Sequence, residues 1–165
     1  MLLKVFESLP DTARLWIYGF KDPLAADDRS MVDERLASFM KTWHSHNADV
    51  TGAYVILEDR FVVLSGTNQN GLSGCSIDSS VENFKHLRDQ HGLDALDRGL
   101  VHYRDNDGNI AALDRGAFRT EVAEGRCGPD TPVFDLTIQT LGDLRSGRFE
   151  IPLSGAWHAT AFLPA

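Results

Sequence analysis

The amino-acid sequence predicts an α+β fold in which an antiparallel sheet carries helices on one face. Short runs rich in β-branched and aromatic residues alternate with longer segments in which apolar residues recur every three or four positions. Over about the first hundred residues the order is strand, helix, strand, strand, helix, strand. This is the order of a ferredoxin-like β-α-β-β-α-β core, and the remaining residues predict a C-terminal extension of that core.

The N-terminal part of the chain predicts one strand and one helix. Residues 14–20 include four consecutive apolar side chains, which is typical of a strand buried on both faces. A helix with one apolar stripe is predicted over 30–46, with Ser30 as its N-cap. His44 and His46 would then lie at the C-terminal end of this helix, where the helix dipole favours protonated histidine.

Two strands and a second helix follow. Residues 52–57 and 61–65 are rich in β-branched residues and are separated by a three-residue turn, which predicts a hairpin. A polar, glycine-rich loop over 66–74 then leads to Cys75. The next helix is predicted over 80–90, because a serine and a following glutamate at its start match a capping box.

The second half of the chain predicts another hairpin and a set of short elements. An Asp-Asn-Asp-Gly turn indicates a hairpin over 100–113, and Asp114 is suited to cap the helix that follows. Residues 131–134 predict either a short helix that begins with proline or an edge strand. Further along, 141–144 predict a turn of helix, whereas 149–152 and 157–158 predict extended segments that pack a C-terminal tail onto the body.

Length and composition are those of one ordinary globular domain. The chain has 165 residues, of which 42% are hydrophobic and 24% are charged. A chain of this length buries enough surface to fold without a disulfide or a metal. No low-complexity linker divides it, so a single domain over 1–165 is predicted. The N-terminus lacks the apolar core of a signal peptide, and no apolar run is as long as a membrane span, which together predict a cytoplasmic protein.

Charge and missing motifs exclude several classes of function. The formal net charge is −8, which disfavours general binding to nucleic acids and to anionic membranes. The sequence contains no phosphate-binding loop, no dinucleotide fingerprint, no His-Glu-x-x-His motif and no nucleophile elbow. We therefore predict no nucleotide-dependent or zinc-protease chemistry and no cofactor.

The segment Gly71–Ser80 combines a thiol, hydroxyls, a carboxylate and backbone N–H groups. Cys75 is predicted to lie a few residues before a helix, whose N–H groups and dipole would favour the thiolate. His46 or His158 could act as its base, and Asp78 could orient either histidine. The alternative is that Cys75 is a small structural side chain in a tight turn.

The same loop could instead bind an anion. Ser73, Gly74 and Ser76 supply hydroxyls and N–H groups close to a helix N-terminus. Arg60 is predicted in the preceding hairpin turn, where it is either an exposed turn residue or, if it folds over the loop, a ligand for a carboxylate or phosphate. Cysteine, histidine and aspartate also bind zinc, but no pair has the spacing of a zinc site, so no metal site is predicted.

Five segments carry a resemblance, which spans most of the chain: Trp43–Asn47, Glu58–Phe61, Ser73–Asp78, Asp130–Phe134 and Trp157–His158. In these segments the chain resembles a family of small uncharacterised bacterial proteins whose most specific motif is Ser-Gly-Cys-Ser-Ile-Asp. Members often carry the label "ABC transporter ATPase", which the missing phosphate-binding loop and the short length contradict here. The resemblance implies no reaction. The chain departs from the family pattern at Gly99 and Ala156.

Two functions from different classes follow from these observations. The first is a non-catalytic binding module in which the Cys75 loop recognises a protein partner or a small anionic ligand. The second is a thiol-dependent enzyme for transfer or hydrolysis, with Cys75 as nucleophile and a histidine as base. The separation of Cys75 from His46 and His158 distinguishes them, because a base must lie within hydrogen-bond reach of the thiol, directly or through one water.

Overall fold

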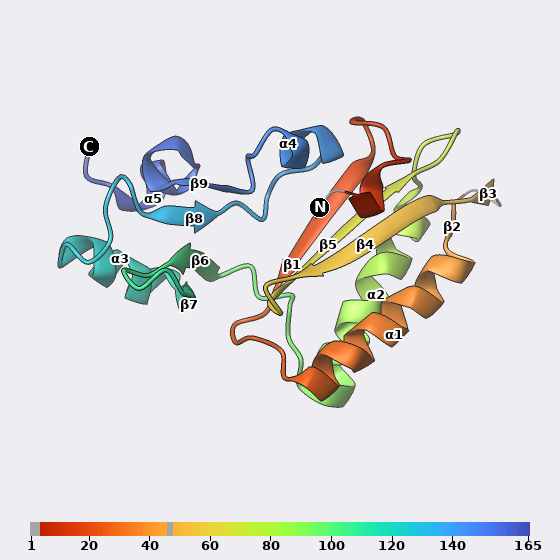
Figure 1. Ribbon diagram of the computed structural model, residues 1–165, viewed down its shortest axis with the longest axis horizontal. Helices are drawn as coiled ribbons and strands as arrows, with labels where there is room; N and C mark the ends of the chain where they lie inside the picture. Colours follow the sequence, from red (N-terminus) through yellow and green to blue (C-terminus); the bar gives the residue numbers. More distant parts are fainter. Residues whose placement is uncertain (1–3, 46–47) are drawn as a thin grey trace.

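The protein is described by a computed structural model that covers residues 4–45 and 48–165 (Figure 1). The α+β fold class is confirmed, because α-helices accompany strands that all pair in antiparallel fashion. The described strands form a three-stranded sheet, a four-stranded sheet and a two-stranded ribbon.

The three-stranded sheet is built from the first half of the chain. Its order is β1-β5-β4, so that β5 is central. β1 covers Arg14–Gly19, β4 covers Thr51–Leu57 and β5 covers Phe61–Thr67. The strand predicted over 14–20 and the hairpin predicted over 52–65 are therefore confirmed.

Two long helices cover one face of this sheet (Figure 1). α1 spans Ala26–Thr42 and α2 spans Gly74–His91. The side chains buried between the helices and the sheet include Tyr18, Phe20, Val32, Leu36, Ile56, Val62, Phe84 and Leu87. The ring of Tyr18 in β1 stacks on that of Phe84 in α2, with 3.6 Å between the ring centroids. This contact holds the middle of α2 on the sheet.

The opposite face of the sheet is covered by two short helices from distant parts of the chain. These are the 3-10 helix η1 (Lys4–Phe6) and α4 (Leu141–Arg145). The buried side chains on this face include Phe6, Leu9, Leu15, Ile17, Val63 and Leu141. Arg145 donates hydrogen bonds to the carbonyl oxygens of Phe6 and Leu9 at 2.9 and 3.0 Å. Both faces of β1 are thus buried, as its run of apolar residues predicts.

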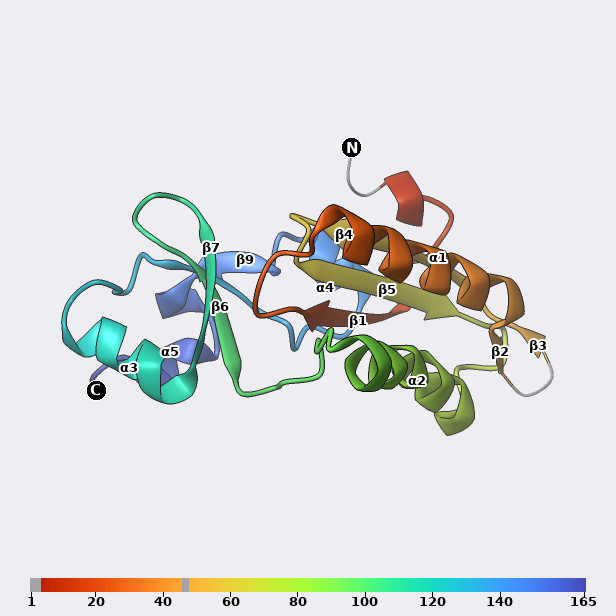
Figure 2. The same ribbon diagram turned by 90° about the horizontal axis from the view of Figure 1, so that it is seen from below.

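The second half of the chain builds the four-stranded sheet, which lies beside the first (Figure 2). Its order is β7-β6-β8-β9. The strands are β6 (Leu100–Arg104), β7 (Ile110–Asp114), β8 (Pro132–Phe134) and β9 (Glu150–Pro152). The helices that pack with this sheet are α3 (Arg115–Ala123), η2 (Leu153–Gly155) and α5 (His158–Phe162). The predicted cap is confirmed, because Asp114 Oδ1 accepts from the N–H of Ala117 at 2.8 Å.

The ferredoxin-like arrangement is not confirmed, because the last strand of the predicted core leaves the first sheet. In that arrangement β6 would lie beside β1, whereas here it pairs with β7 and β8. The outer edge of β1 instead meets the chain at one bridge, between Arg14 and Thr140. The sequence predicts helices on one face of the sheet only. α1 and α2 do share one face, but η1 and α4 cover the other face.

Buried rings join the two sheets. His102 of β6 is 1% exposed, and its Nε2–H donates to the carbonyl oxygen of Phe20 at 3.0 Å. Phe61 of β5 lies 4.9 Å from Phe134 of β8 and 5.1 Å from His102, measured between ring centroids. Burial lowers the pKa of His102 to about 4. The imidazole is therefore neutral at neutral pH and behaves as part of the core.

The predicted boundaries of the first helix are wrong. α1 begins at Ala26 rather than at Ser30, and two aspartates in its first turn favour the helix there without a side-chain cap. The helix also ends before His44. That residue lies in the short strand β2 (His44–Ser45), which pairs with β3 (Ala48–Asp49). The chain turns back on itself here instead of continuing the helix.

Two further predictions concern the C-terminal part. For residues 131–134 the sequence predicts either a short helix or an edge strand. In the structure Pro132–Phe134 form the strand β8, which is not at the edge but lies between β6 and β9. Proline is accepted there because it stands at the first position of the strand. The extended segment predicted over 157–158 is wrong, since α5 begins at His158.

Two glycines make room for the indole of Trp43. Gly52 of β4 and Gly66 of β5 lie directly opposite each other. A Cβ atom would lie 2.9 Å from the Trp43 ring at Gly52 and 2.7 Å from it at Gly66. Because Trp43 is 2% exposed and packs against Phe39 and Trp16, its ring has little space to move away.

We expect Gly66→Ala to lower the free energy of unfolding by about 2–3 kcal/mol, because the added methyl group overlaps the ring of Trp43. Urea unfolding followed by tryptophan fluorescence measures this change. Gly155→Ala is the matched control, since a Cβ there meets open space, and its effect should stay within about 0.5 kcal/mol. Equal effects of the two substitutions would contradict the steric argument.

Candidate functional site

Cys75 lies in the first turn of α2 and not in a loop before it. The helix begins at Gly74 because Ser73 acts as its N-cap: Ser73 Oγ accepts from the N–H of Ser76 at 3.2 Å. The Ser76 hydroxyl in turn donates to the carbonyl oxygen of Ser73 at 2.7 Å. The cap predicted at Ser79 is wrong, since Ser79 lies inside α2 and its hydroxyl donates to the carbonyl oxygen of Ser76 at 2.9 Å.

Trp43 fixes this first turn to the sheet. Its Nε1–H donates to the carbonyl oxygen of Ser76 at 2.9 Å, and this bond is buried. Ser76 itself is 1% exposed. Its side chain therefore serves the helix start, and the predicted role of Ser76 as a ligand contact is wrong because no ligand can reach a hydroxyl buried in this way.

Three candidate residues of the turn face solvent. Gly74, Cys75 and Asp78 are all exposed. Within the described residues the N–H groups of Gly74 and Cys75 meet no acceptor, as expected for the first positions of a helix. The turn thus presents a thiol, a carboxylate and two backbone donors on a rigid support.

The short ribbon of β2 and β3 lies beside this turn, since β2 packs against α2. His44 Nδ1 and Asp49 Oδ1 are 2.8 Å apart across the ribbon. Sequence reasoning missed this pair, because it placed His44 at the end of a helix. The sequence carries little signal for this pair, because β2 and β3 have two residues each and are too short to show a periodic pattern.

The predicted base His158 is remote from Cys75. It opens α5, which lies at the opposite end of the molecule from β2, β3 and the start of α2 (Figures 1 and 2). Its ring is 2% exposed and stacks on Trp157 with 3.9 Å between centroids. Burial lowers the pKa of His158 to about 4, with Arg115 acting in the same direction and Asp135 opposing it. His158 is a core residue, so its predicted catalytic role is wrong.

Arg60 also lies away from the thiol. It stands in the turn between β4 and β5, whereas α2 follows the other end of β5. The side chain is 7% exposed and its guanidinium donates to the carbonyl oxygen of Lys21. Burial lowers the pKa of Arg60. Arg60 thus ties the β4–β5 turn to the β1–α1 loop. Both predicted alternatives are wrong, since Arg60 is neither an exposed turn residue nor folded over the Cys75 loop.

The remaining candidates complete the account of the site. His46 lies outside the described residues. No hydrogen bond joins the Cys75 thiol to a histidine or carboxylate of the described part of the chain. Cys127 is 6% exposed, and burial raises the pKa of its thiol. Of the two thiols, only that of Cys75 is open to solvent.

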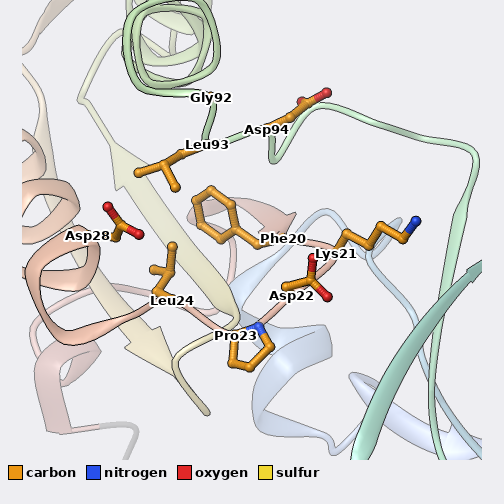
Figure 3. A pocket seen from close by; sticks show the side chains of 9 residues that line it. All are labelled: Phe20, Lys21, Asp22, Pro23, Leu24, Asp28, Gly92, Leu93 and Asp94. Atoms are coloured by element: carbon orange, nitrogen blue, oxygen red, sulfur yellow. The ribbon is translucent and has the colours of Figure 1, made fainter.

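A separate pocket of about 250 Å³ lies between the β1–α1 loop and the end of α2 (Figure 3). Phe20 and Leu24 contribute apolar side chains to it, whereas Asp22, Asp28 and Asp94 lie apart around its rim (Figure 3). No group of three or more histidine, cysteine, aspartate or glutamate side chains in the described residues could hold a metal ion. None of the predicted site residues lines this pocket.

Comparison with models of protein families, with curated proteins and with solved structures finds no match to the chain. The resemblance carried by the Ser-Gly-Cys-Ser-Ile-Asp motif therefore stays a prediction. Among the described residues no helix has both the length and the apolar composition that crossing a bilayer requires.

We expect stability to fall as the pH drops from 7 to 5, because the pKa of His158 in the folded chain, about 4, lies below its ordinary value. Between these values the unfolded chain binds a proton that the folded chain does not, which favours unfolding. His158→Phe removes this proton and keeps an aromatic ring. This substitution should reduce the decrease in the free energy of unfolding between pH 7 and pH 5 by on the order of 1 kcal/mol.

Urea unfolding at the two pH values measures this difference. His86→Phe is the control, because His86 is exposed. This variant should show the same decrease in the free energy of unfolding as the wild-type chain. A loss that His158→Phe does not reduce would show that the His158 ring is not buried in its neutral form.

Proposed function

We propose that the chain is a non-catalytic binding module that contacts a protein partner through the first turn of α2. The observation that supports this most directly is the combination of exposed Gly74, Cys75 and Asp78 with a buried support. Trp43 and Ser73 hold the turn from below, so its exposed groups stay in place without a ligand. Preorganised contacts of this kind reduce the entropy lost on association.

Electrostatics favour a protein partner over a small anion at this surface. Anion binding at a helix N-terminus is strengthened by a nearby cation, and Arg60, the candidate for that role, lies at the other end of the hairpin. Asp78 stands in the turn itself and Asp49 lies on the adjacent ribbon, which adds negative charge. A partner surface with donors and basic side chains suits these groups better than a phosphate or carboxylate.

The alternative, a thiol-dependent enzyme, now depends on a single histidine. His158 is buried at the far end of the molecule, and His44 is paired with Asp49 and makes no hydrogen bond to Cys75. His46 is the base that the alternative still requires. A substitution at His46 therefore separates the two functions.

We expect His46→Ala to leave the rate of Cys75 alkylation by iodoacetamide unchanged between pH 5.5 and 9. A binding surface needs no base, whereas an activated nucleophile loses its thiolate at low pH when the base is removed. Mass spectrometry of the labelled chain gives the rate, and the buried thiol of Cys127 is the internal control. A rate at pH 6 that falls more than about tenfold in the variant would favour the enzyme.

We expect a benzophenone attached to Cys75 to photo-crosslink one major partner in extracts of the source cells. Asp78→Arg should abolish this product, because it reverses the charge in the middle of the contact. Asp130→Arg is the matched control, since Asp130 is exposed on the other half of the chain. Products that survive Asp78→Arg as well as they survive Asp130→Arg would contradict a specific surface at this turn.

A further inference from the structure

A pocket of about 270 Å³ lies beside β1, and three segments far apart in the sequence contribute to it. Residues 14–17 of β1 and residues 136–139 line it, and Arg98 comes from the segment between α2 and β6. Leu15 and Ile17 are at most 2% exposed, so a ligand cannot reach their backbone groups. The lining residues that are exposed are polar, namely Arg14, Arg98, Thr137 and Gln139. A ligand of this pocket is therefore held by side chains.

Two arginines of the pocket have no acidic partner. Arg14 and Arg98 make no ion pair with any described residue. Instead, Arg14 lies over the ring of Trp16 and Arg98 over that of Tyr18, each with its guanidinium carbon 5.9 Å from the ring centroid. The N–H groups of a guanidinium lie in its own plane, so contact with a ring leaves them available to an anion. The two side chains are thus positioned but not neutralised.

The pocket is also a local region of positive charge. Among the described residues no acidic one lines it, whereas each of four other pockets has at least one acidic lining residue. The acidic residues that are next to its lining segments in sequence serve local turns. Asp97 Oδ1 accepts from the N–H of Gly99 and Asp135 Oδ1 from that of Thr137, both at 2.8 Å. In a chain of net charge −8, such a region attracts anions.

The placement of the arginines favours a ligand with two anionic groups. Trp16 and Tyr18 are two residues apart in β1, so their rings project from the same face of the sheet, about 7 Å apart along the strand. One arginine lies over each ring and both line the same pocket, so one ligand meets two separate guanidinium groups. Each guanidinium can bind one carboxylate through two parallel hydrogen bonds. Two carboxylates joined by a short chain match this arrangement.

We propose that the pocket beside β1 binds a short dicarboxylate, with one carboxylate on Arg14 and the other on Arg98. The methylene chain between the carboxylates contacts the half-buried side chains of Trp16 and Leu136, which line the same pocket. A single phosphate concentrates its charge in one group and leaves the second guanidinium without a partner. The proposal uses no residue of the first turn of α2, so this site and the surface around Cys75 can each fail without the other.

The probe is glutarate, and isothermal titration calorimetry of the full chain at low salt measures its binding. We expect one saturable site with a dissociation constant on the order of 1 mM or tighter. Arg14→Gln and Arg98→Gln should each weaken binding about tenfold, the loss typical of one charge-assisted pair. Arg119→Gln is the matched control, since Arg119 is exposed and also lies over a ring, that of Phe162 at 5.6 Å. This control should leave binding unchanged.

Two further anions test the wild-type chain without any substitution. Acetate carries one carboxylate and should bind at least tenfold more weakly than glutarate, because it engages one arginine at a time. Inorganic phosphate should also bind more weakly than glutarate. Circular dichroism verifies that each variant keeps its fold. The proposal is overturned if glutarate does not saturate a site, if acetate or phosphate binds as tightly as glutarate, or if Arg119→Gln weakens binding as much as Arg98→Gln does. Tighter binding of phosphate would assign the pocket to a phosphate-bearing ligand.

Discussion

The packing of the Trp43 indole against the sheet and the start of α2 is the interaction on which the candidate surface around Cys75 depends. It lies on Gly52 and Gly66 of the sheet and donates its one hydrogen bond to the carbonyl oxygen of Ser76 in the first turn of α2. The side chain of Trp43 thus fixes the distance between the sheet and the first turn of α2, and it also anchors the β2–β3 ribbon, which begins at the next residue. Because the indole is almost completely buried, the thiol of Cys75 is displayed on a support that the core itself holds in place.

The α+β class could be predicted because it rests on local patterns. Apolar periodicity, the hairpin turns and the cap at Asp114 depend on residues near one another in sequence. The ferredoxin-like order failed because it required β6 to choose a neighbour. In the structure β6 is held in its place by long-range contacts, among them those of His102 with Phe20 and Phe61, which lie more than 40 residues away in sequence. Nothing in the local sequence of β6 distinguishes a strand beside β1 from one that passes it.

For the candidate site, the sequence predicts a segment in which the structure exposes Gly74, Cys75 and Asp78 together, but it misplaces Arg60 and His158. Cys75 and Asp78 are exposed together because both stand in one helical turn, which a motif of ten residues can indicate. Arg60 and His158 were assigned to the same site on chemical type alone. The sequence does not distinguish a titratable side chain that is buried in the core from one that lies in a functional site. Only the fold shows that His158 stacks on Trp157 and that Arg60 joins two loops.

The division of the strands between two sheets has a consequence during synthesis. All strands of the first sheet lie before residue 68, so β1, β4, β5 and both long helices can assemble once α2 has left the ribosome. One face of that sheet, however, is completed by Leu141 of α4. Some fifty further residues must therefore be translated before this apolar face is fully covered. Chaperones bind exposed apolar surface, so we expect this nascent intermediate to bind one.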